Sequence, residues 1–158
     1  MKKILLLVMI LLLGACGFQL RGTAQLPFQT LYVDSGSSQV GPDLQRGLRY
    51  GTNVRIANTP GEAQAVLQLL GESREKRILS LNAAGRVSEY LLFYRLSFRL
   101  HDGKGKELMP AQPLELKRDF SYNDAQVLAK EQEEILLYKD MQNDAVQQVI
   151  RRLGTLKI

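Results

Sequence analysis

Apolar and polar side chains alternate through residues 90–101, and this alternation restricts the fold more than any other feature of the sequence. One set of alternate positions is entirely apolar or aromatic: Tyr90, Leu92, Tyr94, Leu96, Phe98 and Leu100. The other set becomes polar, with Arg95, Ser97, Arg99 and His101. A period of two is typical of a strand that buries one face and leaves the other in water. The chain therefore needs a second layer that covers the apolar face.

Three other segments have the composition of strands. Residues 30–37 form a β-branched and aromatic run closed by turn residues, and residues 65–82 lead through the turn sequence NAAG into the alternating strand. A second turn, DGKG, separates that strand from residues 114–120, which recover strand character. Pro110 and Pro113 precede this last strand. Because proline cannot donate to a sheet ladder, they predict an edge position or a bulge near its start.

Two helices complete the predicted fold. The first covers residues 41–51, with Pro42 at its start and Gly51 at its end. The second follows an N-cap at Asn123 or Asp124 and runs to Leu153. Its apolar stripe consists of Leu128, Ile135, Tyr138, Met141, Ala145, Val149 and Leu153. The expected class is α+β, with two helices packed on a four-stranded, mainly antiparallel sheet in the order β-α-β-β-β-α.

The N-terminus has the pattern of a bacterial lipoprotein signal. Lys2 and Lys3 precede an apolar run over residues 4–13, and the sequence Leu-Gly-Ala-Cys that ends at Cys16 resembles a lipobox. This resemblance implies a signal peptide of residues 1–15 and one domain of residues 16–158. It also implies N-acyl and S-diacylglycerol groups on Cys16, and no other cofactor. Gly17, where a retention signal would have Asp, favours the periplasmic side of the outer membrane. The alternative is an unmodified buried cysteine.

The composition excludes several classes of function. A single cysteine cannot form an intrachain disulfide, and with a single histidine, His101, the chain lacks a His/Cys cluster for zinc or a nucleophile-and-base pair. We therefore predict no metal site and no catalytic residues. Removal of Lys2 and Lys3 with the signal lowers the formal net charge from +5 to +3. So small a charge, without an aromatic and basic motif, does not indicate nucleic-acid binding.

Several motifs together resemble the LptE family of lipopolysaccharide-assembly lipoproteins. They are CGFQLRG after the lipobox, SEY at the start of the alternating strand, FSYNDAQVLAKEQEE before the long helix and DAVQQVIRRL at its end. The resemblance implies a non-enzymatic role. It implies a plug in the lumen of the LptD β-barrel, which the protein helps to assemble, and assistance in delivering lipopolysaccharide to the outer leaflet. An accessory lipoprotein of another outer-membrane assembly machine remains the alternative.

Candidate lipopolysaccharide contacts are basic, because arginine and lysine bind phosphates through charge-assisted hydrogen bonds. Lys130 matches the lysine of the family's LAK stretch and is the leading candidate. The family also tends to place a basic residue near a hairpin tip that corresponds here to SLNAAG, where Arg77 and Arg86 flank the tip instead. Lys130 could equally be a solvated helix residue beside glutamates. The run ESREKR, which ends at Arg77, is more typical of a solvated strand end than of a binding patch.

Overall fold

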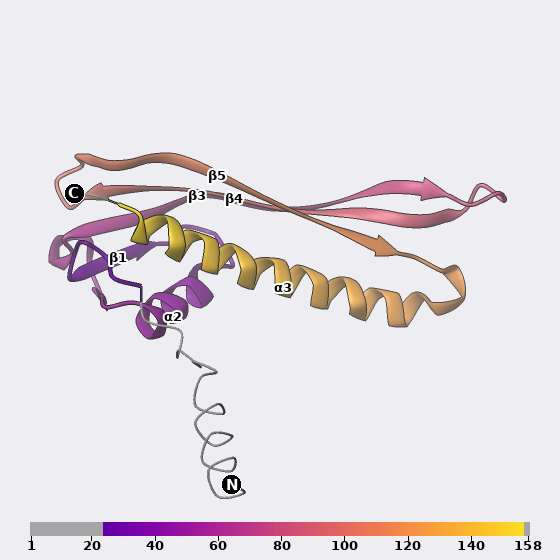
Figure 1. Ribbon diagram of the computed structural model, residues 1–158, viewed down its shortest axis with the longest axis horizontal. Coiled ribbons are helices and arrows are strands. Elements are labelled where there is room, and N and C mark those ends of the chain that lie inside the picture. Colours follow the sequence, from indigo (N-terminus) through magenta and orange to yellow (C-terminus); the bar gives the residue numbers. More distant parts are fainter. Residues whose placement is uncertain (1–23, 157–158) are drawn as a thin grey trace, which may run out of the picture.

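The computed structural model describes residues 24–156 (Figure 1). Along the chain the elements are β1 (Thr30–Asp34), α2 (Gly41–Gly51), β2 (Arg55–Ile56), a 3-10 turn η1 (Pro60–Glu62), β3 (Ala65–Leu81), β4 (Val87–Asp102), β5 (Glu107–Ser121), a 3-10 turn η2 (Asp124–Gln126) and α3 (Val127–Gly154). Cys16 and the predicted signal peptide lie outside the described residues. Within residues 24–156, none of the helices combines the length and the apolar composition that crossing a membrane requires.

The strands form one sheet in the order β2-β1-β3-β4-β5. β4 pairs antiparallel with both β3 and β5, whereas β1 runs parallel to β2 and β3. The α+β class and the mainly antiparallel sheet are therefore confirmed. The predicted count of four strands is one too low, because β2 is only two residues long and leaves no periodic pattern in the sequence.

β5 lies at an edge of the sheet, as its prolines predict. Its register with β4 slips near Pro110, where Phe98 pairs with Gln112 but Leu100 pairs with Met109. The strand thus contains both the edge position and the irregularity that the sequence indicates. Because proline without an N–H is tolerated at an edge, β5 extends back to Glu107 and does not start after Pro113.

Much of the hydrophobic core lies at one end of an elongated molecule, and the core continues along the sheet to Leu92 and Phe120. In Figure 1, β1 and α2 gather at this end, while the long strands β3, β4 and β5 extend well beyond it and α3 runs alongside them. The apolar face of β4 is buried as predicted, through Leu92, Tyr94, Leu96, Phe98 and Leu100. On α3 the buried stripe begins only at Tyr138 and continues through Met141, Ala145, Val149 and Leu153.

Leu128 and Ile135, predicted as part of that stripe, are 79% and 59% exposed. Leu128 precedes Val146 by 18 residues, or five helical turns, so the two lie on the same side of α3. Val146 is covered there by α2, since a Cβ placed on Gly47 would meet Val146 and Ile150. The 11 residues of α2 are too few to reach Leu128 and Ile135. The apolar stripe of α3 therefore extends beyond the part of the helix that α2 covers, and its first residues stay exposed.

Candidate functional site

Lys130 is held against the sheet near the start of α3. Asn123, one of the two predicted caps, caps the 3-10 turn η2, since its Oδ1 accepts a 3.0 Å hydrogen bond from the backbone N–H of Ala125. The helix α3 itself begins after Gln126 without a side-chain cap. Lys130 Nζ donates to Ser121 Oγ at 3.0 Å and to Glu133 Oε2 at 2.8 Å, and it lies 5.5 Å from the ring centroid of Phe120. The side chain is only 14% exposed. Lys130 is therefore not a freely solvated helix residue.

Three aromatic rings form a platform beside Lys130. The centroid of Phe120 lies 6.3 Å from that of Tyr90, and the two rings are stacked. Tyr122 meets Tyr90 edge to face at 5.2 Å and Phe120 at 6.5 Å. We call Tyr90, Phe120 and Tyr122 the aromatic platform. Phe120 is only 1% exposed, so the platform is packed into the core, and its π faces attract the cations that lie over them.

Lys76 adds a second cation to the aromatic platform. Its Nζ lies 4.9 Å from the centroid of Tyr90 and forms a 2.6 Å ion pair with Glu134 of α3. Lys76 and Lys130 thus sit over two neighbouring rings, each paired with a glutamate. No motif in the sequence points to Lys76. Lys76 lies on this side because the register of β3 pairs it with the inward-facing Leu92, whereas simple alternation from Leu69 would place it on the outer face.

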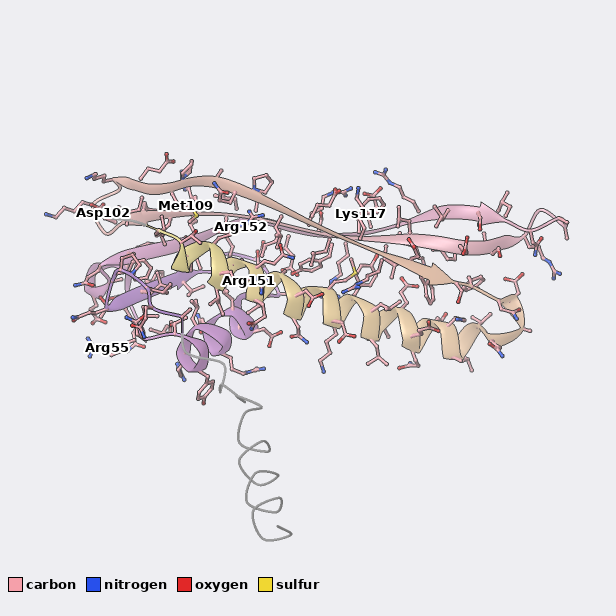
Figure 2. All side chains as sticks on the ribbon, viewed as in Figure 1. Arg55, Asp102, Met109, Lys117, Arg151 and Arg152 are labelled. Carbon is pink, nitrogen blue, oxygen red and sulfur yellow. The ribbon has the colours of Figure 1, made fainter. Side chains whose placement is uncertain are left out.

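Arg77 lies on the opposite face of the sheet from Lys130. Arg77 directly follows Lys76 along β3, so their side chains point to opposite faces. Its guanidinium carbon lies 4.9 Å from the ring centroid of Phe93. Phe93 is on the outer face, because its neighbour Tyr94 faces the core. Arg95 and Lys117 approach the same ring at 4.7 Å and 5.3 Å. Figure 2 shows Lys117 on the side of the sheet away from α3. Phe93 is only 5% exposed because these cations cover it.

Glutamates join these cations into one network across three strands. Glu75 pairs with both Arg77 and Arg95, and Glu115 pairs with both Arg95, at 2.6 Å, and Lys117, at 3.0 Å. We call Arg77, Glu75, Arg95, Glu115 and Lys117 the outer-face network. Hydrogen bonds from Arg77 and then Arg95 lower the pKa of Glu75 to about 2. Hydrogen bonds from Arg95 and then Lys117 also lower the pKa of Glu115.

Arg86 lies in the turn that joins β3 to β4. Asn82 Oδ1 accepts 3.0 Å hydrogen bonds from the backbone N–H groups of Ala84 and Arg86, and Gly85 adopts a φ of +73°. The side chain of Arg86 is exposed at the tip of this hairpin. The three predicted contacts therefore occupy separate positions: Lys130 on the helix-covered side, Arg77 on the outer face and Arg86 at the tip. The structure brings Lys130 together with Lys76 and does not bring it together with Arg77.

Exposed apolar side chains occur near the β3–β4 hairpin and in the first half of α3. Ile78, Leu79 and Leu81 near the end of β3 are all exposed, as are Leu128 and Ile135 of α3. Two cations over aromatic rings, flanked by exposed apolar residues, make a surface suited to an amphiphile with anionic groups. Within residues 24–156, no group of three or more histidine, cysteine, aspartate or glutamate side chains could hold a metal ion.

Solved structures of lipoproteins share this fold. A solution structure of a lipoprotein B from Nitrosomonas europaea has a TM-score of 0.77 at 43% identity, covering 87% of this chain and 90% of that one. A crystal structure of the rare lipoprotein B from Shewanella oneidensis has a TM-score of 0.68 at 30% identity, covering 80% of this chain and 95% of that one.

Relatives found by sequence are also lipoproteins. An LPS-assembly lipoprotein LptE from Yersinia enterocolitica is 32% identical over 160 residues, which cover 96% of this chain and 75% of the relative. A protein of the same name from Pectobacterium atrosepticum is 32% identical over 158 residues, with 93% and 81% covered. The sequence profile of the LptE family, described as lipopolysaccharide-assembly, matches residues 28–153. The chain therefore belongs to the LptE family of lipopolysaccharide-assembly lipoproteins.

Proposed function

We propose that this protein is the non-enzymatic lipoprotein subunit of an outer-membrane lipopolysaccharide translocon. In this role it occupies the lumen of the LptD β-barrel, helps that barrel to assemble, and assists delivery of lipopolysaccharide to the outer leaflet. Acyl groups on Cys16 anchor it to the periplasmic side of the outer membrane. Membership of the family and the names of its relatives support the role in lipopolysaccharide assembly.

The observation that carries the proposal is the pair of lysines over the aromatic platform. Lys130 and Lys76 would bind phosphates of lipid A through charge-assisted hydrogen bonds, which are stronger than neutral ones. In the free protein, carboxylate oxygens of Glu133 and Glu134 occupy the places that phosphate oxygens would take. Exposed apolar residues beside the platform, such as Ile78 and Leu128, would meet acyl chains.

Arg77 and Arg86 would contribute additional contacts from the hairpin. Arg86 is exposed at the tip, so it can approach a phosphate without breaking an ion pair with another element. Arg77 would have to exchange its Glu75 partner for the ligand. We therefore expect Lys130 to contribute more to lipopolysaccharide binding than Arg77 does.

A polar outer surface supports the plug role. The outer-face network presents charged groups from β3, β4 and β5 on the side of the sheet away from α3. The lumen of a large outer-membrane barrel is polar, so a plug must offer it polar groups. The outer-face network would meet the barrel while the aromatic platform meets lipopolysaccharide.

Affinity capture of the acylated protein from native membranes tests the proposal. Mass spectrometry of the captured protein should show an acylated N-terminal Cys16, and the retained partner should be an LptD barrel with lipopolysaccharide. Retention of the barrel of a different assembly machine would support the alternative function. An unmodified Cys16 in membrane-derived protein would contradict the anchor.

A further inference from the structure

The described chain begins at one defined place, beside the C-terminal ends of the two helices. The backbone N–H of Ala24 donates to the carbonyl oxygen of Gly51 at 2.8 Å. On the other side, a Cβ placed on Gly154 would lie 3.9 Å from Cβ of Ala24. Ala24 also forms a parallel bridge with Thr52. Because the two bridged segments run in the same sense, the chain that precedes Ala24 sets out toward Gly51 and the last turn of α2.

A groove between α2 and α3 opens one helical turn from this point. It has a volume of about 370 Å³, and its lining includes Gly47 and Tyr50 of α2 and Val146 and Gln147 of α3. Val146 is buried beside Gly47, which adds no side chain to fill the space, whereas Tyr50 is 76% exposed. Binding pockets in proteins usually have volumes of roughly 300–1,000 Å³. We call this space the interhelix groove, and it is large enough to hold apolar side chains.

The segment before Ala24 is long enough to lie in the interhelix groove. Val146 precedes Gly154 by eight residues, a distance of about 12 Å at a helical rise of about 1.5 Å per residue. Leu20 precedes Ala24 by four residues, and Phe18 precedes it by six. Because an extended chain covers about 3.3–3.6 Å per residue, these two positions reach about 14 Å and about 21 Å from Ala24. Both side chains are therefore within range of the groove.

The same segment has the pattern of an extended chain that buries one side. Residues 17–23 have the sequence GFQLRGT, in which the apolar Phe18 and Leu20 alternate with the polar Gln19 and Arg21. Alternate side chains of an extended chain point to the same side. Phe18 and Leu20 would thus face the groove together while Gln19 and Arg21 stay in water. Removal of the two apolar side chains from water favours this arrangement.

We propose that residues 17–23 dock in the interhelix groove, with Leu20 and Phe18 on its floor. This inference goes beyond the proposed function, and the docking needs no acyl group. Where Cys16 is acylated, only Gly17 separates the anchor from the docked side chains, so the anchor is held beside α2 and α3. The lipopolysaccharide contacts proposed above are on other surfaces and take no part in the docking.

Covalent connection favours this occupant over a separate partner. A segment joined to the domain by a short linker binds as if it were present at millimolar concentration. Its chain is already fixed at Ala24 by backbone hydrogen bonding, so little additional freedom is lost on docking. A separate peptide would lose its translational and rotational freedom as well. The groove therefore binds residues 17–23 before it binds another chain.

Site-specific photocrosslinking in native membranes tests the docking. The full chain carries p-benzoylphenylalanine at position 20, and after illumination the crosslinked peptides of the processed protein are mapped by mass spectrometry. Position 20 should form crosslinks within the chain, to residues 43–50 of α2 and 143–147 of α3, which contain the groove lining. The matched control carries the same photoreactive residue at position 19. Because that side chain points the other way, it should form such crosslinks several-fold less often.

Two substitutions relate these crosslinks to the groove. Tyr50→Ser removes the exposed side chain from the groove lining and should lower the intrachain yield from position 20 several-fold. Arg49→Ser changes the preceding residue, which is also exposed but is not part of that lining, and should leave the yield unchanged. Equal yields in these two variants would contradict docking against Tyr50.

The outcomes separate this inference from the proposed function. Crosslinks from position 20 mainly to lipid or to another protein, or equal intrachain yields from positions 19 and 20, would overturn the docking. Capture of the LptD barrel in the same preparation would leave the translocon role intact. Intrachain crosslinks from position 20 without a captured LptD barrel would instead support the docking and contradict the proposed function. Should the change at position 20 disturb processing, position 18 provides a second reporter on the same side of the segment.

Discussion

The hydroxyl of Tyr94 donates a 2.8 Å hydrogen bond to Oε1 of Glu72, and this pair ties the middle of the sheet to the start of α2. Oε2 of Glu72 accepts the backbone N–H of Val40, the residue before the helix, at 3.0 Å. Burial, and then the hydrogen bond to Glu72, raises the pKa of Tyr94 above its ordinary value. A carboxylate thus holds together a fully buried phenol and a helix end that has no side-chain cap of its own.

Removing the Tyr94 hydroxyl should therefore destabilise the fold. Tyr94→Phe is expected to lower the free energy of unfolding by about 1–3 kcal/mol, because a hydrogen bond to a charged group is lost and Glu72 keeps fewer partners. Chemical denaturation measures the change. Tyr50→Phe is the matched control, since Tyr50 is exposed, and it should leave stability unchanged. Equal losses for the two variants would contradict the role of the Tyr94–Glu72 pair.

The two faces of β4 should respond differently to substitution. Leu96→Asp places an unpaired charge on the face covered by the helices, where Leu96 is buried. The expected cost is several kcal/mol against a total stability of about 5–15 kcal/mol, so the domain should unfold. Arg99→Ser on the exposed face loses one side-chain hydrogen bond to Gln68 and should be mild. Similar melting temperatures would show that the faces are assigned wrongly.

The outer-face network should make stability depend on pH in acid. The folded pKa of Glu75 is about 2, below its ordinary value of 4.5. Between these values the unfolded chain binds more protons than the folded one, so stability rises with pH. The contribution of Glu75 is complete above about pH 4.5 and is lost as the pH falls toward 2. Glu75→Gln should flatten the melting temperature in this window, whereas Glu131→Gln on α3 should not. Identical pH profiles for the two variants would argue against the network.

Gly47 permits a close approach of α2 and α3. A Cβ at this position would lie 2.8 Å from Cγ1 of Val146 and 3.2 Å from Cδ1 of Ile150. Alanine is worth ~1 kcal/mol more than glycine inside a helix, so propensity alone predicts that Gly47→Ala stabilises the fold. We expect a net loss of about 1 kcal/mol, because the β-branched Val146 cannot easily rotate away. Val146→Ala in the Gly47→Ala background should recover part of it, and a double-mutant cycle measures this coupling.

The sequence was sufficient for features that depend on local periodicity. Alternation from Tyr90 to Leu100 identified the buried face of β4, and Pro110 and Pro113 identified the edge strand. The sequence was insufficient where a register shift reverses which residues of a strand face the core. In β3, Leu67 and Leu69 pair with inward-facing residues, but a register shift between Leu69 and Gly71 reverses the alternation.

After this shift the even-numbered residues Glu72, Arg74 and Lys76 lie on the helix-covered side of β3. Simple alternation from Leu69 would have placed Lys76 on the outer face, so its position beside Lys130 could not be inferred. The exposure of Leu128 has a similar origin. Its place in an apolar stripe is correct, but whether a stripe is buried depends on how far the neighbouring helix extends.

Lys130 should contribute more to lipopolysaccharide binding than an exposed lysine elsewhere on α3 does. Lys130→Glu reverses the charge over Phe120 and should weaken lipopolysaccharide capture about tenfold or more, taking about 1.5–3 kcal/mol for a hydrogen bond to a charged group. Lys130→Met keeps the aliphatic stem on the ring and removes only the charge, so it separates charge from packing. Lys139→Glu is the matched control, because Lys139 is an exposed lysine farther along the same helix. Capture of lipopolysaccharide and of the barrel should be compared at matched protein levels and at two salt concentrations, since screening weakens surface charge effects.

The assignment of Lys130 is supported if both Lys130 variants retain the barrel but capture less lipopolysaccharide, while Lys139→Glu captures as much as the wild type. Unchanged lipopolysaccharide binding, or loss of the barrel as well, would refute it, and an additional loss in Lys76→Glu would place both lysines in one site.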